Sequence, residues 1–89
     1  MIIFNNDDGG YLKWVQENNH GYVVNYSVYG ASANLSLHRA KCQTLNGRNR
    51  TTWTSNGHAK TCSNDRQELV NWARARYGRK PLPCAICKP

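Results

Sequence analysis

The stretch Tyr22-Val23-Val24-Asn25-Tyr26-Ser27-Val28-Tyr29 has the strongest strand pattern in the 89-residue sequence. Its β-branched and aromatic residues alternate in part with polar ones, and this pattern is typical of a half-buried strand. Residues 30–33 supply a turn, and residues 34–38 then alternate polar and apolar side chains. We therefore expect an antiparallel hairpin whose second strand ends at His38.

Two helices are expected, one before this hairpin and one well after it. Asp8 is placed to cap a helix over about residues 9–19. A second helix would begin after Ser63 or Asn64, because apolar residues recur at helical spacing over residues 69–77. Weaker strand patterns near residues 51–54 and 60–62 would extend the sheet.

Two pairs of metal-ligating residues lie far apart in the sequence. Cys84 and Cys87 can place both thiolates on one metal ion, because a tight turn directs their sulfurs to the same centre. His38 and Cys42 are four residues apart, a spacing that one helical turn brings to one face. Zinc accepts three thiolates and one imidazole in a tetrahedral set. We predict that these four residues bind one structural zinc ion.

Cys62 leaves a second ligand set open. It precedes the second helix and is expected to be an ordinary buried residue. If it bound the metal instead, it would replace His38 and complete an all-cysteine site. Neither His20 nor His58 is expected to be a ligand.

These patterns together predict an α+β fold with a small antiparallel sheet, two helices and a zinc site that closes the C-terminus. Residues 1–89 should form a single zinc-binding domain, because a chain this short rarely builds a second hydrophobic core. A core of this size barely offsets the conformational entropy of folding, so a bound metal would add needed stability.

The ending Pro83-Cys84-Ala85-Ile86-Cys87-Lys88-Pro89, with the upstream His38-x3-Cys42 pair, resembles the zinc module at the N-terminus of the Ada DNA-repair protein and related small domains. The resemblance covers about the last half of the chain and implies a zinc-bound fold. The interval between the two pairs is longer than the family pattern and contains Cys62. His38 stands where the Ada protein has its methyl-accepting cysteine, so the resemblance implies the fold rather than the repair chemistry.

The net charge of +7 is concentrated in one half of the chain. Residues 38–89 carry eleven cations and two acids, whereas residues 1–37 carry one cation and three acids. A field this uneven attracts polyanions, and DNA or RNA is the expected partner. Phosphate contacts are predicted for cations beside the metal ligands and on the adjoining loop, with an aromatic ring able to stack on a base. The predicted nucleic-acid-binding residues are Arg39, Lys41, Arg48, Arg50, Trp53 and Lys88.

The sequence carries no paired-carboxylate motif, Gly-rich phosphate loop or hydrolase elbow, so catalysis is not expected. The enzymatic alternative is a small basic ribonuclease or toxin that uses His20, His38 and His58 as acid, base and phosphate contacts. A redox role for Cys84 and Cys87 ranks below it, because redox pairs of this kind normally open a helix. The other alternative is a protein-interaction module of a larger bacterial or phage system, with an acidic protein partner.

The first residues do not form a signal-peptide pattern. Met1 to Phe4 are apolar but run directly into Asn5, Asn6, Asp7 and Asp8. The sequence also lacks an apolar stretch of bilayer-spanning length, so no membrane partner is expected. We expect a cytoplasmic location, a reducing compartment in which four cysteines indicate metal binding rather than disulfides.

Overall fold

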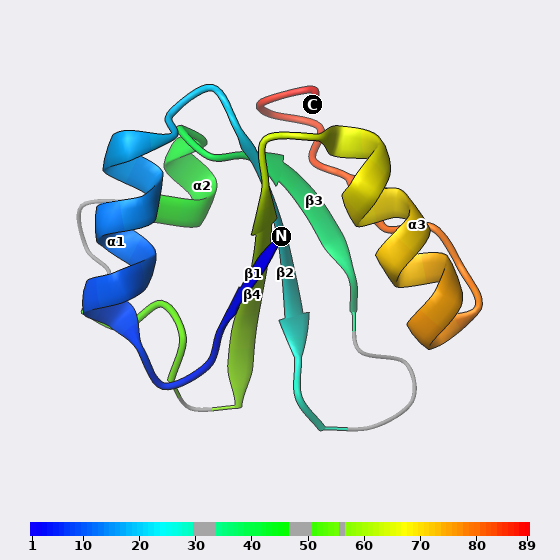
Figure 1. Ribbon diagram of the computed structural model, residues 1–89, viewed down its shortest axis with the longest axis horizontal. Helices are drawn as coiled ribbons and strands as arrows, with labels where there is room; N and C mark the ends of the chain where they lie inside the picture. Colours follow the sequence, from blue (N-terminus) through cyan, green and yellow to red (C-terminus); the bar gives the residue numbers. More distant parts are fainter. Residues whose placement is uncertain (30–33, 47–50, 56) are drawn as a thin grey trace.

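The computed structural model describes residues 1–29, 34–46, 51–55 and 57–89. Strands and helices in these ranges form one sheet with helices on both faces (Figure 1). In chain order the elements are β1 (Ile2–Phe4), α1 (Asp8–Glu17), β2 (Tyr22–Ser27), β3 (Ser36–Arg39), α2 (Gln43–Asn46), β4 (His58–Ser63), α3 (Arg66–Tyr77) and β5 (Leu82–Pro83). The predicted α+β class is confirmed, with the single-turn helix α2 in addition to the two longer helices.

The sheet has the strand order β1-β4-β2-β3-β5. The predicted hairpin is present: β2 pairs antiparallel with β3, and Val23 lies opposite His38. On its other side β2 pairs antiparallel with β4, from Tyr22 opposite Ser63 to Ser27 opposite His58. The predicted antiparallel sheet is formed by β1 to β4, and β5 adds one parallel pair with β3 at its edge. Helix α3 carries the chain back along the sheet before β5, so β5 runs in the same direction as β3.

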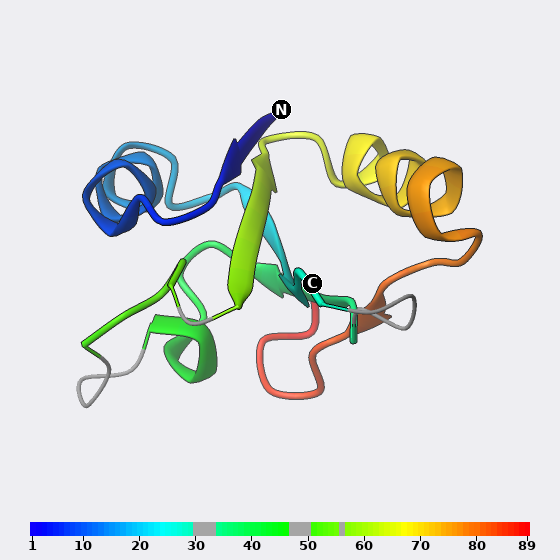
Figure 2. The ribbon, with the colours of Figure 1, turned by 90° about the horizontal axis from the view of Figure 1, so that it is seen from below.

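The strand β2 is buried on both faces of the sheet, which explains why its polar and apolar residues alternate only in part. Val23 packs toward α1 and α2 with Tyr11 and Leu45, and Val24 packs toward α3 with Leu69. Figure 2 shows the resulting layers, with α1 and α2 on one side of the strands and α3 on the other. Each layer therefore has its own hydrophobic cluster.

Both long helices are capped by an aspartate one or two residues from the predicted position. Asp7, not Asp8, caps α1, and its carboxylate accepts a hydrogen bond of 2.9 Å from the backbone N–H of Gly10. Asp65, rather than Ser63 or Asn64, caps α3 and accepts from the N–H of Gln67 at 3.0 Å. The cap is the side chain whose oxygen is free to accept the first N–H groups of the helix. A neighbouring side chain that forms its hydrogen bonds elsewhere cannot also do this.

The segment just before β4 differs from its prediction. Residues 51–55 form bends rather than the expected short strand, because the N–H groups of Trp53 and Thr54 both donate to the carboxylate of Asp8. The strand expected near residues 60–62 is confirmed and extends over His58–Ser63. Over the described ranges, none of the helices has the length and apolar character needed to cross a membrane.

Candidate metal centre

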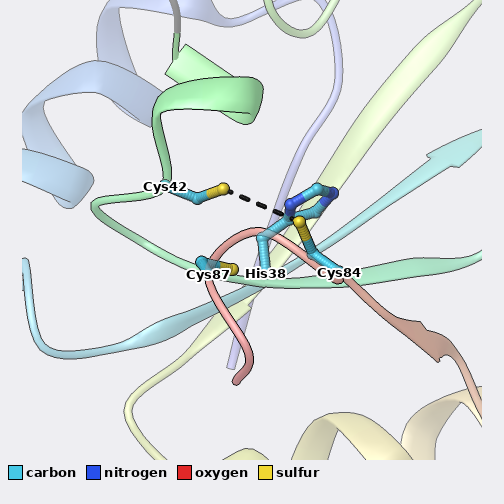
Figure 3. Close-up of side chains that lie close together, drawn as sticks. All are labelled: His38, Cys42, Cys84 and Cys87. Carbon is cyan, nitrogen blue, oxygen red and sulfur yellow. Dashed lines mark hydrogen bonds between the residues drawn. The ribbon is translucent and has the colours of Figure 1, made fainter.

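Four predicted ligands converge at one point beside β3. The imidazole of His38 and the sulfurs of Cys42, Cys84 and Cys87 lie within 4.8 Å of one another, and the side chains point to a common centre (Figure 3). The sulfurs of Cys42 and Cys84 are 3.9 Å apart. With Zn–S bonds of about 2.3 Å, a tetrahedral ion holds two sulfurs about 3.8 Å apart. The donor set and its spacing therefore fit one tetrahedral metal ion.

The same distance shows that these cysteines are not joined to each other. A disulfide holds its sulfurs about 2.05 Å apart, well below the 3.9 Å between Cys42 and Cys84. All four cysteines of the chain are free thiols. The cluster is therefore available to bind a metal.

Strand pairing places Cys84 next to His38. β5 lies beside β3 with Leu37 opposite Pro83, and the N–H of Cys84 donates to the carbonyl of Leu37 at 2.9 Å. This bond continues the pairing of β3 with β5 by one residue. Cys84 therefore lies beside His38, the residue that follows Leu37. A tight turn closed by the bond from the N–H of Lys88 to the carbonyl of Cys84, at 3.1 Å, then returns the chain past the cluster.

Cys42 reaches the cluster through a second turn. β3 ends at Arg39, and the N–H of Cys42 donates to the carbonyl of Arg39 at 3.0 Å. The carbonyl of Cys42 then accepts the N–H groups of Leu45 and Asn46, so α2 begins directly after this cysteine. The four-residue spacing of His38 and Cys42 therefore works through a strand end and a turn rather than through one helix.

Hydrogen-bond donors surround the sulfur atoms. The backbone N–H of Arg39 donates to Sγ of Cys87 at 3.2 Å, and that of Ile86 donates to Sγ of Cys84 at 3.4 Å. The hydroxyl of Thr44 lies 2.9 Å from Sγ of Cys42. Such donors stabilise thiolate charge and orient metal ligands. Thr44 was not among the predicted residues, although a threonine two residues after a ligand and at the start of a helix is a recognisable signal.

The two cysteines of the C-terminal turn ionise differently. The backbone N–H of Cys87, helped by that of Ile86 and by the Thr44 hydroxyl, lowers the pKa of Cys84 to about 7. Burial raises the pKa of Cys87 to about 11, against the N–H of Arg39, which lowers it. Cys84 is therefore the more easily ionised thiol of the pair.

Cys62 lies apart from the cluster. It sits on β4 opposite Val23, is fully buried in the core beneath α1 and α2, and does not belong to the group of four ligands. Burial raises the pKa of its thiol to about 12. The all-cysteine alternative therefore finds no support in the geometry.

The predicted nucleic-acid-binding residues are distributed unevenly around the cluster. Lys41 and Lys88 are exposed, and each is adjacent in sequence to a cysteine of the cluster. Arg39 is half-buried, and its guanidinium donates to the carbonyls of Cys87 and Lys88 at 2.9 and 3.0 Å. Trp53 is half-buried against the α1 side of the core. Arg48 and Arg50 lie outside the described residues.

Comparison of the chain with protein-family models, with curated proteins and with solved structures found no match. The likeness to the Ada zinc module therefore stays a prediction from the sequence.

Proposed function

We propose that this chain is a structural zinc module in which His38, Cys42, Cys84 and Cys87 bind one zinc ion. The convergence of four ligand atoms within 4.8 Å, from segments up to 49 residues apart, supports this. Thiolate and imidazole ligands favour zinc over hard cations such as magnesium or calcium. Because protein atoms fill all four positions, the site is of the closed, structural type rather than the open, catalytic type.

A bound metal would add to the backbone hydrogen bonds that join the C-terminal segment to β3. The two large apolar side chains of this segment, Leu82 and Ile86, are 74% and 70% exposed, so hydrophobic burial contributes little to its docking. Structural zinc contributes about 10–16 kcal/mol of apparent binding free energy in small peptides at neutral pH. Bound zinc would therefore stabilise the whole fold by fixing this segment to β3.

Elemental analysis and chelation test the zinc proposal. Protein purified without added metal should contain one zinc per chain, and a strong chelator should abolish the cooperative melting transition. Re-addition of zinc should restore it. Metal-free protein that melts at an unchanged temperature would contradict the proposal.

We further propose that the basic surface beside the metal site binds DNA or RNA, without catalysis by this chain. Lys41 and Lys88 support this, because their side chains make no hydrogen bond or ion pair with any part of the chain that the structure describes. Zinc would hold both cations at fixed positions, because each adjoins a ligand. The likeness to the Ada module adds support for nucleic-acid contact. A titration with labelled DNA and RNA at several salt concentrations tests it, as developed in the Discussion.

The ladder between β2 and β4 argues against the ribonuclease alternative. His58 lies opposite Ser27 at one end of this ladder, while His20 precedes Tyr22 at the other end. Six residues of strand separate the ends by about 17 Å. His20 and His58 are too far apart to act together as acid and base on one phosphate, and His38 lies in the cluster of metal ligands.

A further inference from the structure

A groove of about 440 Å³ lies between α3 and the segment that leads into β5. Both elements are on the same side of the sheet in Figure 2, away from α1 and α2. The volume falls within the range of about 300–1,000 Å³ that is typical of ligand pockets. Three cations line the groove over an aliphatic floor: Arg66, Arg74 and Lys80 above Leu37, Val70 and Pro81.

Two of the cations stand in a row on one face of α3. Arg66, Val70 and Arg74 follow each other at intervals of four residues, so all three lie on the same side of the helix. At 1.5 Å per residue, the two arginines are about 12 Å apart along the helix axis. The row therefore presents two guanidinium groups with an apolar side chain between them.

The positive charge of the groove is not neutralised by described residues of the same chain. The side chains of Arg66, Arg74 and Lys80 are exposed and form no hydrogen bond or ion pair with any described residue. Among described residues, no carboxylate lines the groove. The nearby acids are used elsewhere, since Asp65 caps α3 and Glu68 pairs with the N-terminal amine at 3.3 Å. An anionic ligand is therefore favoured.

The floor of the groove distinguishes between classes of anion. Leu37, Val70, Pro81 and Pro83 are aliphatic, and no aromatic ring of the described chain lines the groove. Single-stranded nucleic acids are usually held by bases that stack on aromatic side chains, and this groove offers no such platform. An aliphatic side chain would instead gain free energy by burial against the floor. The lining therefore suits a peptide that carries both carboxylates and an aliphatic residue.

Strand β5 cannot recruit this peptide as an added strand. The N–H groups of Leu82 and Cys84 both donate to β3, at 3.0 and 2.9 Å. The alternate positions are Pro81 and Pro83, which have no N–H to offer. Only carbonyl acceptors remain at these positions, so recognition depends mainly on side chains, above all on the guanidinium groups.

We propose that this groove binds an acidic peptide segment of a partner protein, with an aliphatic side chain on the Leu37–Val70–Pro81 floor and carboxylates held by Arg66 and Arg74. The spacing of about 12 Å corresponds to carboxylates three to four residues apart in an extended segment. This binding site uses neither the zinc ligands nor Lys41 and Lys88. It therefore goes beyond the zinc module and its nucleic-acid contact.

Fluorescence anisotropy with the zinc-loaded full chain tests the proposal. The probe is a fluorescein-labelled peptide of about ten residues in which two leucines lie between two pairs of glutamates. Arg66→Gln and Arg74→Gln should each weaken its binding about tenfold, because each removes a charge-assisted hydrogen bond to a carboxylate. Replacement of both leucines of the probe by serine should also weaken binding at least tenfold.

Arg76→Gln is the matched control, because it removes the same charge from α3 at a side chain that contacts Tyr77 and does not line the groove. It should change peptide affinity by less than twofold, and circular dichroism and zinc content should show that all three variants fold. Equal effects of the three variants would overturn the proposal, as would absence of peptide binding. It would also be overturned if an oligothymidine of equal charge bound more tightly and lost its affinity in Arg66→Gln, since the groove would then be a nucleic-acid site.

Discussion

The backbone N–H of Arg39 donates a hydrogen bond of 3.2 Å to Sγ of Cys87, which joins the C-terminal turn to the strand that carries His38. The guanidinium of the same arginine donates to the carbonyls of Cys87 and Lys88. One residue at the end of β3 thus holds the turn at three atoms. Arg39, predicted as a phosphate contact, is already engaged in positioning Cys87, one of the proposed metal ligands.

Removal of the Arg39 side chain is therefore expected to weaken metal binding without abolishing it. Arg39→Ala should lower zinc affinity about tenfold, the lower end of what substitutions around metal ligands typically cost, because the backbone bond to Cys87 remains. Competition with a chromogenic chelator measures the change. Lys41→Ala is the control, since this exposed side chain also adjoins a ligand but contacts no sulfur. Equal affinities of the two variants would contradict the positioning role.

Substitution of the ligands should separate the His38 site from the all-cysteine alternative. Cys84→Ser and Cys87→Ser should abolish tight zinc binding, and His38→Ala should weaken it strongly, because each removes one of four ligands. Cys62→Ala should keep one zinc per chain, although the buried cavity it leaves lowers the melting temperature. Elemental analysis of each variant provides the measurement. Loss of zinc in Cys62→Ala, with retention in His38→Ala, would favour the alternative set.

Local sequence patterns predicted the hairpin and the ligands, but not the pairing that assembles them. A His-x3-Cys pair and a Cys-x-x-Cys pair are local signals of metal chemistry, readable without the fold. The strand β5 is different, because Leu82–Pro83 has no pattern of its own and forms only by pairing with β3. β1 was missed for the same reason, since two of its three residues are half exposed at the sheet edge.

Buried polar groups were the other gap in the prediction. Lys60 belongs to the basic half of the chain, and its local sequence gives no sign of burial, because a lysine in a polar segment normally faces solvent. In the structure it is fully buried, and its ammonium donates to Asn25 Oδ1 at 2.8 Å and to the carbonyl of Trp53 at 2.6 Å. Its burial depends on partners 35 and 7 residues away, which no local pattern joins to it.

Lys60 is accordingly expected to be essential for stability rather than for nucleic-acid binding. Lys60→Met keeps the length of the side chain but leaves two part-buried acceptors without their donor, which should cost about 2 kcal/mol. Urea unfolding of the zinc-loaded protein measures the loss. Lys13→Met removes an exposed lysine from α1 and should change stability by less than about 0.5 kcal/mol. Similar stabilities of the two variants would argue against the buried network.

A pH-dependent contribution is expected from Asp8. Its carboxylate accepts hydrogen bonds from the hydroxyl of Thr54, at 2.7 Å, and from the backbone N–H groups of Thr54 and Trp53, which together lower its pKa below the ordinary 3.8. A carboxyl group with a lowered folded-state pKa stabilises the fold fully above its unfolded pKa. That stabilisation is lost as the pH falls through the folded pKa.

Asp8→Asn should therefore destabilise the protein by about 1 kcal/mol, a value reduced for the solvent exposure of the group. The difference from wild type should stay constant between pH about 8 and about 5 and shrink only below about 4, because only there does the carboxylate begin to protonate. Urea unfolding at several pH values measures it. Glu17→Gln removes the same charge from α1 at an exposed position and should have little effect. A difference that already shrinks between pH 7 and 5 would contradict a lowered pKa.

The nucleic-acid contact is expected to reside in the cations next to the proposed zinc ligands. Each phosphate that a cation neutralises releases condensed counterion, so affinity should fall with salt at a slope of about −0.9 per contact on duplex DNA, or about −0.7 on single strands. Lys41→Gln and Lys88→Gln should each weaken binding about equally for all sequences and make the slope shallower by about one. Trp53→Ala should weaken single strands more than duplexes if its ring stacks on a base.

Lys13→Gln is the matched control for these variants, because it removes an equal charge from α1, on the acidic N-terminal part of the chain. It should leave the salt slope unchanged, since only cations that touch phosphates release counterions from them. The same titrations with Arg66→Gln separate this surface from the groove beside α3, which should not contribute to the slope. If zinc-loaded protein binds neither DNA nor RNA at low salt, where attraction between charges is strongest, the nucleic-acid proposal is wrong. The acidic-peptide groove should then still bind its ligand, because its cations lie on α3 and in the approach to β5 rather than beside the proposed zinc site.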